Sequence, residues 1–219
     1  MERIVITGMG TVNPLGLSVE ESWRNAVNGI SGVGPNTQFD TSEYLVKIAC
    51  EVKNFAPEKY MDAKEVRRRD RFEQYATAAT QEALAQSELA ITEESAPRIG
   101  VVISSAIGGL QSLEEAIFAV RDSSPRRISP FMIPMLMPNG ASGLVAIDHG
   151  IKGPCFSVAS ACASGANEPK TVFEHAQSAW AVGNITLGSR LAFREGRVLV
   201  VPTQLDDLLK KKTAEVMEV

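Results

Sequence analysis

Short apolar runs alternate with longer amphipathic segments along most of the chain. Three apolar runs predict buried strands at residues 3–7, 99–104 and 155–159. Apolar positions at helical spacing, with capping and stop signals, predict helices at residues 19–28, 69–86, 112–120 and 139–149. Because strands and helices alternate, we expect an α/β fold with a mainly parallel sheet and flanking helices.

Other segments have weaker patterns. Three prolines among methionines predict irregular structure or a broken helix in residues 129–138, and weak alternation predicts a short strand in residues 47–53. Towards the end of the chain we expect an amphipathic helix over residues 168–181, a strand over 197–201 and a last helix over about 204–218.

Composition narrows the possible functions. The chain has 219 residues, of which 44% are hydrophobic and 22% charged, and its net charge is −4. An acidic chain disfavours a general nucleic-acid binder, and the lack of an 18-residue apolar run predicts no membrane span. Cys50, Cys155 and Cys162 are too few and too scattered for a disulfide framework or a zinc site. We therefore expect a protein of the reducing cytoplasm.

A glycine-rich turn follows the first predicted strand. Gly8, Gly10 and Asn13 approximate the G-x-G-x-x-G pattern that binds dinucleotides, but asparagine replaces the third glycine and Pro14 interrupts the helix start. The alternative is a turn that simply ends the strand, and the sequence favours this alternative.

Cys162 is the strongest candidate for chemistry. It follows the run at residues 155–159, and its neighbours in SACASGAN are all small, which allows the chain to turn sharply from a strand into a helix. The positive end of a helix favours the thiolate, and nearby backbone N–H groups can hold an oxyanion. The alternative is a buried structural cysteine, which is the interpretation we favour for Cys50 and Cys155.

Positive charge is concentrated in two places, although the chain as a whole is acidic. One cluster contains Lys64, Arg67, Arg68, Arg69 and Arg71, and a second is the pair Arg126 and Arg127. Such runs are often only a solvated surface. A compact basic patch also suits a phosphate-bearing or acidic protein partner.

Five ordered segments resemble the N-terminal half of the β-ketoacyl-(acyl-carrier-protein) synthase II family, condensing enzymes of the thiolase superfamily. These segments are RIVITGMGTVNPLG at 3–16, KEVRRRDRFEQYA at 64–76, GVVISSAIGGL at 100–110, SPFMIPMLMPNGASG at 129–143 and KGPCFSVASACASGAN at 152–167. The resemblance implies a thiolase-like N-terminal half over residues 1–167 and makes the dinucleotide interpretation unnecessary.

The resemblance also implies a reaction and a set of site residues. Cys162 would take an acyl group from acyl carrier protein, and malonyl carrier protein would then lose carbon dioxide and attack the thioester in fatty-acid elongation. Ile107 and Met132 fall at acyl-pocket positions near the dimer interface of the family. The family's carrier-docking positions correspond here to Lys64, Arg67, Arg68, Arg126 and Arg127. No bound cofactor or metal is implied, because the carrier delivers the phosphopantetheine arm, and a homodimer is expected.

Residues 168–219 depart from the family pattern. The family's second half supplies two catalytic histidines, a lysine and a phenylalanine loop, and neither His149 nor His175 matches them. We expect this tail not to rebuild that half, so the chain alone would not perform decarboxylative condensation and would associate or dissolve poorly. The alternative function is a non-catalytic module that binds the carrier or oligomerises.

Overall fold

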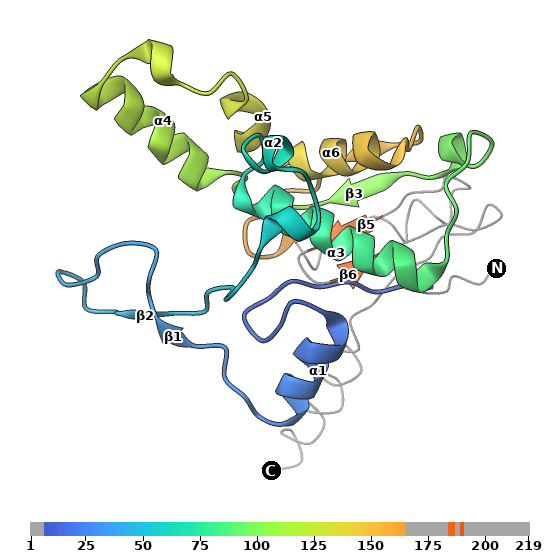
Figure 1. Ribbon diagram of the computed structural model, residues 1–219, viewed down its shortest axis with the longest axis horizontal. Helices are drawn as coiled ribbons and strands as arrows, with labels where there is room; N and C mark the ends of the chain where they lie inside the picture. Colours follow the sequence, from blue (N-terminus) through green and yellow to red (C-terminus); the bar gives the residue numbers. More distant parts are fainter. Residues whose placement is uncertain (1–6, 165–183, 187–188, 191–219) are drawn as a thin grey trace.

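The computed structural model describes residues 7–164, 184–186 and 189–190 (Figure 1). In chain order, its helices are α1 (Val19–Val27), η1 (Pro57–Lys59), α2 (Ala63–Val66), α3 (Arg71–Ser87), η2 (Ala96–Arg98), α4 (Leu110–Asp122), η3 (Pro125–Arg127), α5 (Met132–Leu136) and α6 (Gly140–His149). Its strands are β1 (Gly34–Pro35), β2 (Ile48–Ala49), β3 (Val101–Ile103), β4 (Cys155–Phe156), β5 (Asn184–Thr186) and β6 (Ser189–Arg190). None of the described helices is both long and apolar enough to cross a membrane.

The four helices predicted from periodicity are present with small shifts at their ends, and the proline-rich segment contains the five-residue helix α5. The helices predicted after residue 167, and the strand over residues 197–201, lie outside the described residues. The predicted strand at residues 47–53 is reduced to the two residues of β2, which pairs antiparallel with β1.

Among the described residues, β3 is the centre of a sheet with the order β4-β3-β5-β6. It pairs in parallel with β4, in the register Val101 to Cys155, and in parallel with β5, while β5 and β6 are antiparallel. The two predicted strands at 99–104 and 155–159 are therefore adjacent and parallel, as expected. Since all but one residue of the predicted strand at 3–7 lies outside the described residues, its place in this sheet stays a prediction.

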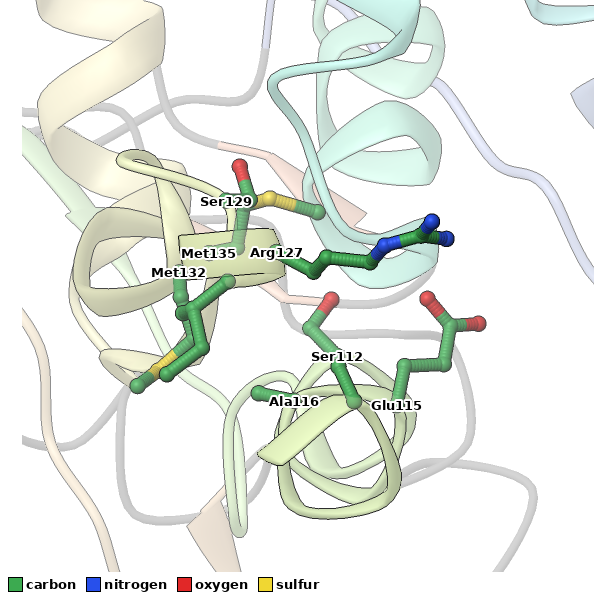
Figure 2. Close-up of a pocket in the computed structure, with 9 residues that line it drawn as sticks. Ser112, Glu115, Ala116, Arg127, Ser129, Met132 and Met135 are labelled. Carbon is green, nitrogen blue, oxygen red and sulfur yellow. The ribbon is translucent and has the colours of Figure 1, made fainter. Parts of the chain in front are cut away.

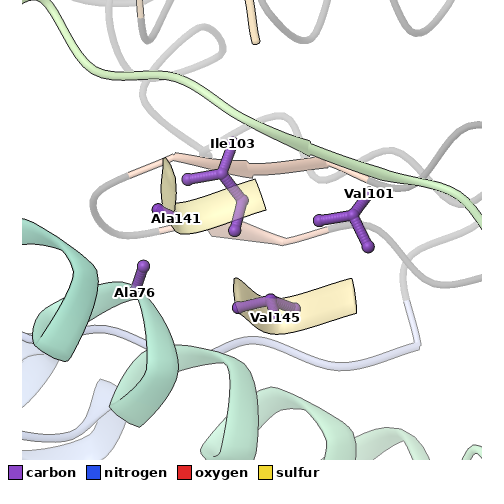
Figure 3. Packing of buried hydrophobic residues seen from close by; sticks show 5 residues of the cluster. All are labelled: Ala76, Val101, Ile103, Ala141 and Val145. Atoms are coloured by element: carbon purple, nitrogen blue, oxygen red, sulfur yellow. The ribbon is translucent and has the colours of Figure 1, made fainter. Parts of the chain in front are cut away.

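The core lies between β3 and two helices (Figure 3). Val101 and Ile103 on β3 pack with Ala76 of α3 and with Ala141 and Val145 of α6, and all five are buried. Each fully buried valine or isoleucine side chain stabilises the fold by about 1.5–3 kcal/mol. The alanines leave room for the two helices to approach each other and the strand closely, which accounts for the small residues on α3.

The glycine-rich turn is explained by its contact with α3. A side chain on Gly8 would collide with the backbone of Ala83, and one on Gly10 would collide with the backbone of Ala79. These glycines therefore let the chain run against the helix. The backbone N–H of Thr11 donates to Glu82 of α3 at 2.9 Å, which fixes the turn in place. The glycines therefore have a structural role, which agrees with the alternative that this turn simply ends the strand.

Candidate active site and docking surface

The segment that carries Cys162 is held between the sheet and α6. Ser142 of α6 accepts a hydrogen bond from the Ile103 N–H at 2.9 Å, and its hydroxyl oxygen lies 2.9 Å from the Phe156 carbonyl at the end of β4. Beyond β4, the N–H of Val158 donates to the Ser104 hydroxyl at 3.1 Å. The ends of β3 and β4 thus fix the start of the segment that leads to Cys162.

Cys162 lies in a tight turn that closes on a buried serine. The Ser160 N–H donates to the Ser164 hydroxyl at 2.9 Å, and that hydroxyl donates to the Ala161 carbonyl at 2.7 Å. Ala161 has a φ of 50°, a left-handed conformation that is costly for a residue with a side chain. This conformation bends the chain sharply just before Cys162, and the role of Cys162 as a nucleophile stays a prediction.

The thiol of Cys162 is exposed, so a substrate can reach it. Ser164, two residues further on, is helical and is the last residue described before the gap. The helix that we expect to begin here extends outside the described residues, so its effect on the thiol stays a prediction.

The other two cysteines are also exposed, and the expectation that they are buried is wrong. Cys50 directly follows the two-residue strand β2, and Cys155 begins β4, which lies at the edge of the described sheet. A short edge strand buries less of its side chains than the central strand β3 does. Partial desolvation nevertheless raises the pKa of the Cys155 thiol.

A small cavity of about 140 Å³ lies between α4, η3 and α5 (Figure 2). Met132 and Met135 form one side of it and Ala116 of α4 lies opposite, while Arg127 and Glu115 lie at its polar side. A cavity of this size holds a group of roughly six carbon atoms, such as a benzene ring. Met132 therefore lines a partly open pocket, and its role in binding an acyl chain stays a prediction.

Ile107 is placed differently. Its side chain is 60% exposed in the loop between β3 and α4, and it is not among the residues that line this cavity. The structure therefore does not bring the two predicted acyl-pocket residues together in the described part of one chain.

The predicted docking cations fall into two groups. Lys64, Arg67, Arg126 and Arg127 are exposed. Arg68 is half-buried: its Nη1 lies 3.2 Å from Glu65 Oε1, and its guanidinium lies 4.4 Å from the centre of the Phe131 ring.

Arg69, which the sequence counts within the same basic cluster, does not face solvent. Its side chain is 3% exposed and makes two hydrogen bonds to the Asp148 carboxylate of α6, at 2.6 and 2.7 Å. It also donates to the Thr77 hydroxyl at 2.9 Å. Arg69 therefore joins α3 to α6 and leaves the surface to its neighbours.

Two buried acids beside Arg69 were missed by the sequence analysis. The Asp70 carboxylate accepts from the Phe72 N–H of α3 and from the Ser112 hydroxyl of α4, the latter at 2.6 Å. Glu73 is fully buried, and one of its oxygens accepts from the Asp70 N–H at 2.8 Å. Burial raises the pKa of Glu73 to about 7. The pattern D-x-x-E before a helix, a form of the capping box, is the signal that would have found both.

Comparison with solved structures identifies the fold of this chain. A β-ketoacyl synthase from Burkholderia phymatum STM815 superposes with a TM-score of 0.72 at 26% identity, over 84% of this chain and 46% of that one. The ishigamide ketosynthase/chain length factor gives a TM-score of 0.71 at 23% identity, over 96% of this chain and 50% of that one. The fold is thus the thiolase-like fold of ketosynthases.

The sequence comparison gives the family. The model of the beta-ketoacyl synthase N-terminal domain matches residues 1–179, so the chain belongs to the β-ketoacyl synthase family. The 3-oxoacyl-[acyl-carrier-protein] synthase 2 of Staphylococcus aureus (strain COL) is 46% identical over 188 residues, which cover 86% of this chain and 45% of that protein. The enzyme of the same name from Synechocystis is 40% identical over 191 residues, which cover 87% of this chain and 46% of that protein. The chain spans about half the length of the relatives that it matches.

Proposed function

We propose that this chain supplies the nucleophile-bearing half of a 3-oxoacyl-acyl-carrier-protein synthase that elongates fatty acids. The observation that carries the proposal is the exposed thiol of Cys162 at the tip of the turn that follows β4. Two relatives at 46% and 40% identity, both named 3-oxoacyl-[acyl-carrier-protein] synthase 2, support it.

In the first step, the Cys162 thiolate attacks the carbonyl carbon of an acyl thioester on the carrier. A C–S bond forms, and the tetrahedral oxyanion collapses with loss of the phosphopantetheine thiolate. The backbone N–H of Cys162 is the donor that we propose for the oxyanion, since the N–H groups of Ser160, Ala163 and Ser164 make hydrogen bonds within the turn. The acyl group is then a thioester of Cys162.

In the second step, malonyl carrier protein loses carbon dioxide, and the carbanion attacks the Cys162 thioester. A C–C bond forms, the C–S bond breaks, and the thiolate is released with the 3-oxoacyl carrier as product. We propose that this step needs groups of the family's second half, because neither His149 nor His175 matches the two catalytic histidines that the resemblance implies.

The docking surface that we propose for the carrier consists of the exposed cations Lys64, Arg67, Arg126 and Arg127, with Arg68 at its inner margin. An acidic carrier with a phosphate-bearing arm is attracted to such a surface. A solved type II polyketide ketosynthase of the same fold, AntDE, is described in complex with the acyl-carrier protein AntF, which supports this class of partner.

We also propose that the chain forms a homodimer in the cytoplasm and that the complete sheet is mainly parallel. Support for association comes from α4, which extends away from the sheet (Figure 1) and carries Leu110, Ile117 and Val120 in exposed positions. Exposed apolar side chains on one helix favour contact with a second surface. Light scattering across a concentration series tests this: a constant monomer mass contradicts the dimer.

The proposed acyl transfer is tested by intact-mass measurement after the chain is mixed with acyl carrier protein. We expect one acyl adduct on the native chain and on Cys155→Ala, and none on Cys162→Ala. Cys155→Ala is the matched control, because Cys155 is a second exposed thiol on the same segment of chain. An adduct that persists in Cys162→Ala, or no adduct on the native chain, overturns the proposal.

A further inference from the structure

We propose that Arg68 and Phe131 form a clasp that positions α5, so that Arg68 is a positioning residue through which the docking surface controls the acyl group that the Met132 cavity accepts. The inference rests on the proposed acyl-transfer function. It adds a specificity role to a cation that would otherwise count only as a contact for the carrier.

Arg68 differs from the other docking cations by its two partners. Its side chain is one-third exposed and its Nη1 is 3.2 Å from Glu65 Oε1. The guanidinium lies over the face of Phe131, 4.4 Å from the ring centre, well within the range of a cation–π contact. One side chain thus joins α2 to the residue immediately before α5.

The end of the clasp on α2 is anchored in the core. Glu65 uses its second oxygen to accept from Arg69 Nη2 at 3.2 Å. Arg69 in turn is buried and bidentate on Asp148 of α6. A planar guanidinium with two parallel hydrogen bonds is fixed in orientation, and this holds Glu65, which stands between the two arginines.

The other end of the clasp, Phe131, lies in the chain between residues that line the cavity. Phe131 is the N-cap residue of α5, its carbonyl accepts from the Met135 N–H at 3.0 Å, and its own N–H donates to the Ser129 hydroxyl at 3.2 Å. Met132 and Met135 both line the cavity, and so does Ser129 (Figure 2). A shift of the Phe131 ring therefore moves the cavity wall.

The cavity and the docking surface also share Arg127, which lines the cavity although it is exposed. Because α5 has only five residues and its N-terminus has no side-chain cap, few internal contacts hold it. The clasp supplies an external contact. A carrier that draws Arg68 towards its own acidic groups would change this contact at the moment when the acyl group is delivered.

The test uses the full chain with carriers that bear short, medium and long acyl groups. Rates of Cys162 acylation are measured by intact mass, and affinity for the unloaded carrier is measured separately. We expect Phe131→Leu to change the ratio of short-chain to long-chain acylation rates by about fivefold, the factor that corresponds to one cation–π contact. Carrier affinity should change less than twofold. Phe131→Tyr, which keeps a ring beneath the guanidinium, should restore the ratio.

The matched control is Phe118→Leu. Phe118 also lies under an arginine, with Arg121 at 4.6 Å, but both residues belong to α4, so this contact does not connect two elements. Three results would overturn the proposed clasp while leaving the acyl-transfer proposal intact. These are an unchanged ratio in Phe131→Leu, an equal change in Phe118→Leu, and an altered ratio in Phe131→Tyr. A native chain that takes no acyl group from any carrier overturns the proposed function and the clasp together. If Phe131→Leu does not fold, Arg68→Lys replaces it, with an expected smaller change in the same ratio.

Discussion

Two arginines separated by one residue lie in opposite environments. Arg67 ends α2 and is exposed, whereas Arg69 is almost fully buried against α3 and α6. The difference lies in the partners. Arg69 meets a carboxylate that is already placed on another helix, and this offsets the cost of removing its charge from water. A run of like charges in a sequence therefore gives no uniform surface, since each position follows the geometry of the elements around it.

Two buried acids that follow this run, Asp70 and Glu73, connect the helices behind the docking surface. Asp70 joins the start of α3 to α4 through Ser112, and Glu73 lies at the start of α6, where a side chain on Gly140 would collide with its free oxygen. Within the described residues the exposed cations have no comparable buried partners, so their variants should alter binding more than folding.

The largest expected effect comes from Arg69→Met. It removes two hydrogen bonds to the partly exposed carboxylate of Asp148 and should lower the free energy of unfolding by roughly 3 kcal/mol or more, since each hydrogen bond to a charged group contributes about 1.5–3 kcal/mol. Arg67→Met, the same substitution at an exposed position, should change it by less than about 0.5 kcal/mol. Urea unfolding of both variants measures this. Equal losses in the two variants would contradict the distinction between the buried and exposed arginines.

The second effect is a pH dependence due to Glu73. Its pKa of about 7 in the folded chain lies above the ordinary value of 4.5, so the folded state binds the proton more tightly. Stability should therefore fall as the pH rises from about 4.5 to about 7 and then level off, with a total loss of roughly 3 kcal/mol.

Glu73→Gln removes this titration, so the variant should gain stability over the native chain as the pH rises through this window. Unfolding curves at pH 5 and pH 8 test the prediction. Glu114→Gln is the control, because Glu114 is an exposed glutamate on α4. A Glu73→Gln variant that follows the native chain at both pH values would show that Glu73 is charged in the fold.

The sequence predicted the elements that depend on periodicity and missed those that depend on partners. The helices and the β3–β4 pair follow from apolar spacing, because the same spacing buries Val101 and Ile103. β5 and β6 have only three and two residues, which is too short for an apolar spacing to be recognised. Burial of Arg69 depends on Asp148, which lies 79 residues further along the chain. A local sequence pattern cannot predict a contact between residues so far apart.

The same division holds for the candidate site. Cys162 could be found because small residues around a cysteine mark a sharp turn, and the structure shows that turn. The left-handed conformation of Ala161 could not be predicted, since alanine rarely adopts it. The Met132 cavity arises from three elements that meet in space. The resemblance predicts an acyl-pocket role for Met132 and Ile107, and the exposure of Ile107 depends on the loop before α4.

The third effect concerns the exposed cations. Arg67→Glu and Arg126→Glu should each weaken binding of acyl carrier protein by about threefold to tenfold, because exposed charges steer and hold an acidic partner while contributing little to stability. The loss should shrink as salt is raised, since the Debye length falls to about 3 Å at 1 M.

Arg98→Glu is the matched control for these reversals. Arg98 is exposed in η2, which follows the C-terminal end of α3, whereas α2 precedes its N-terminal end (Figure 1). Titration of labelled carrier protein at low and high salt gives the affinities. Equal weakening by Arg98→Glu would mean that net charge, rather than this surface, attracts the carrier.

The smallest expected difference separates two residues that are both exposed. Cys162 should react with a thiol-directed alkylating agent a few times faster than Cys155 at pH 8, because partial burial raises the pKa of the Cys155 thiol and leaves less thiolate there. The rate at Cys155 should continue to rise as the pH is raised towards 10. Peptide mapping after brief labelling measures both rates in one sample, with Cys50 as an internal reference in an exposed position. Faster labelling of Cys155 or Cys50 than of Cys162 would show that exposure alone does not make the turn after β4 a nucleophilic site.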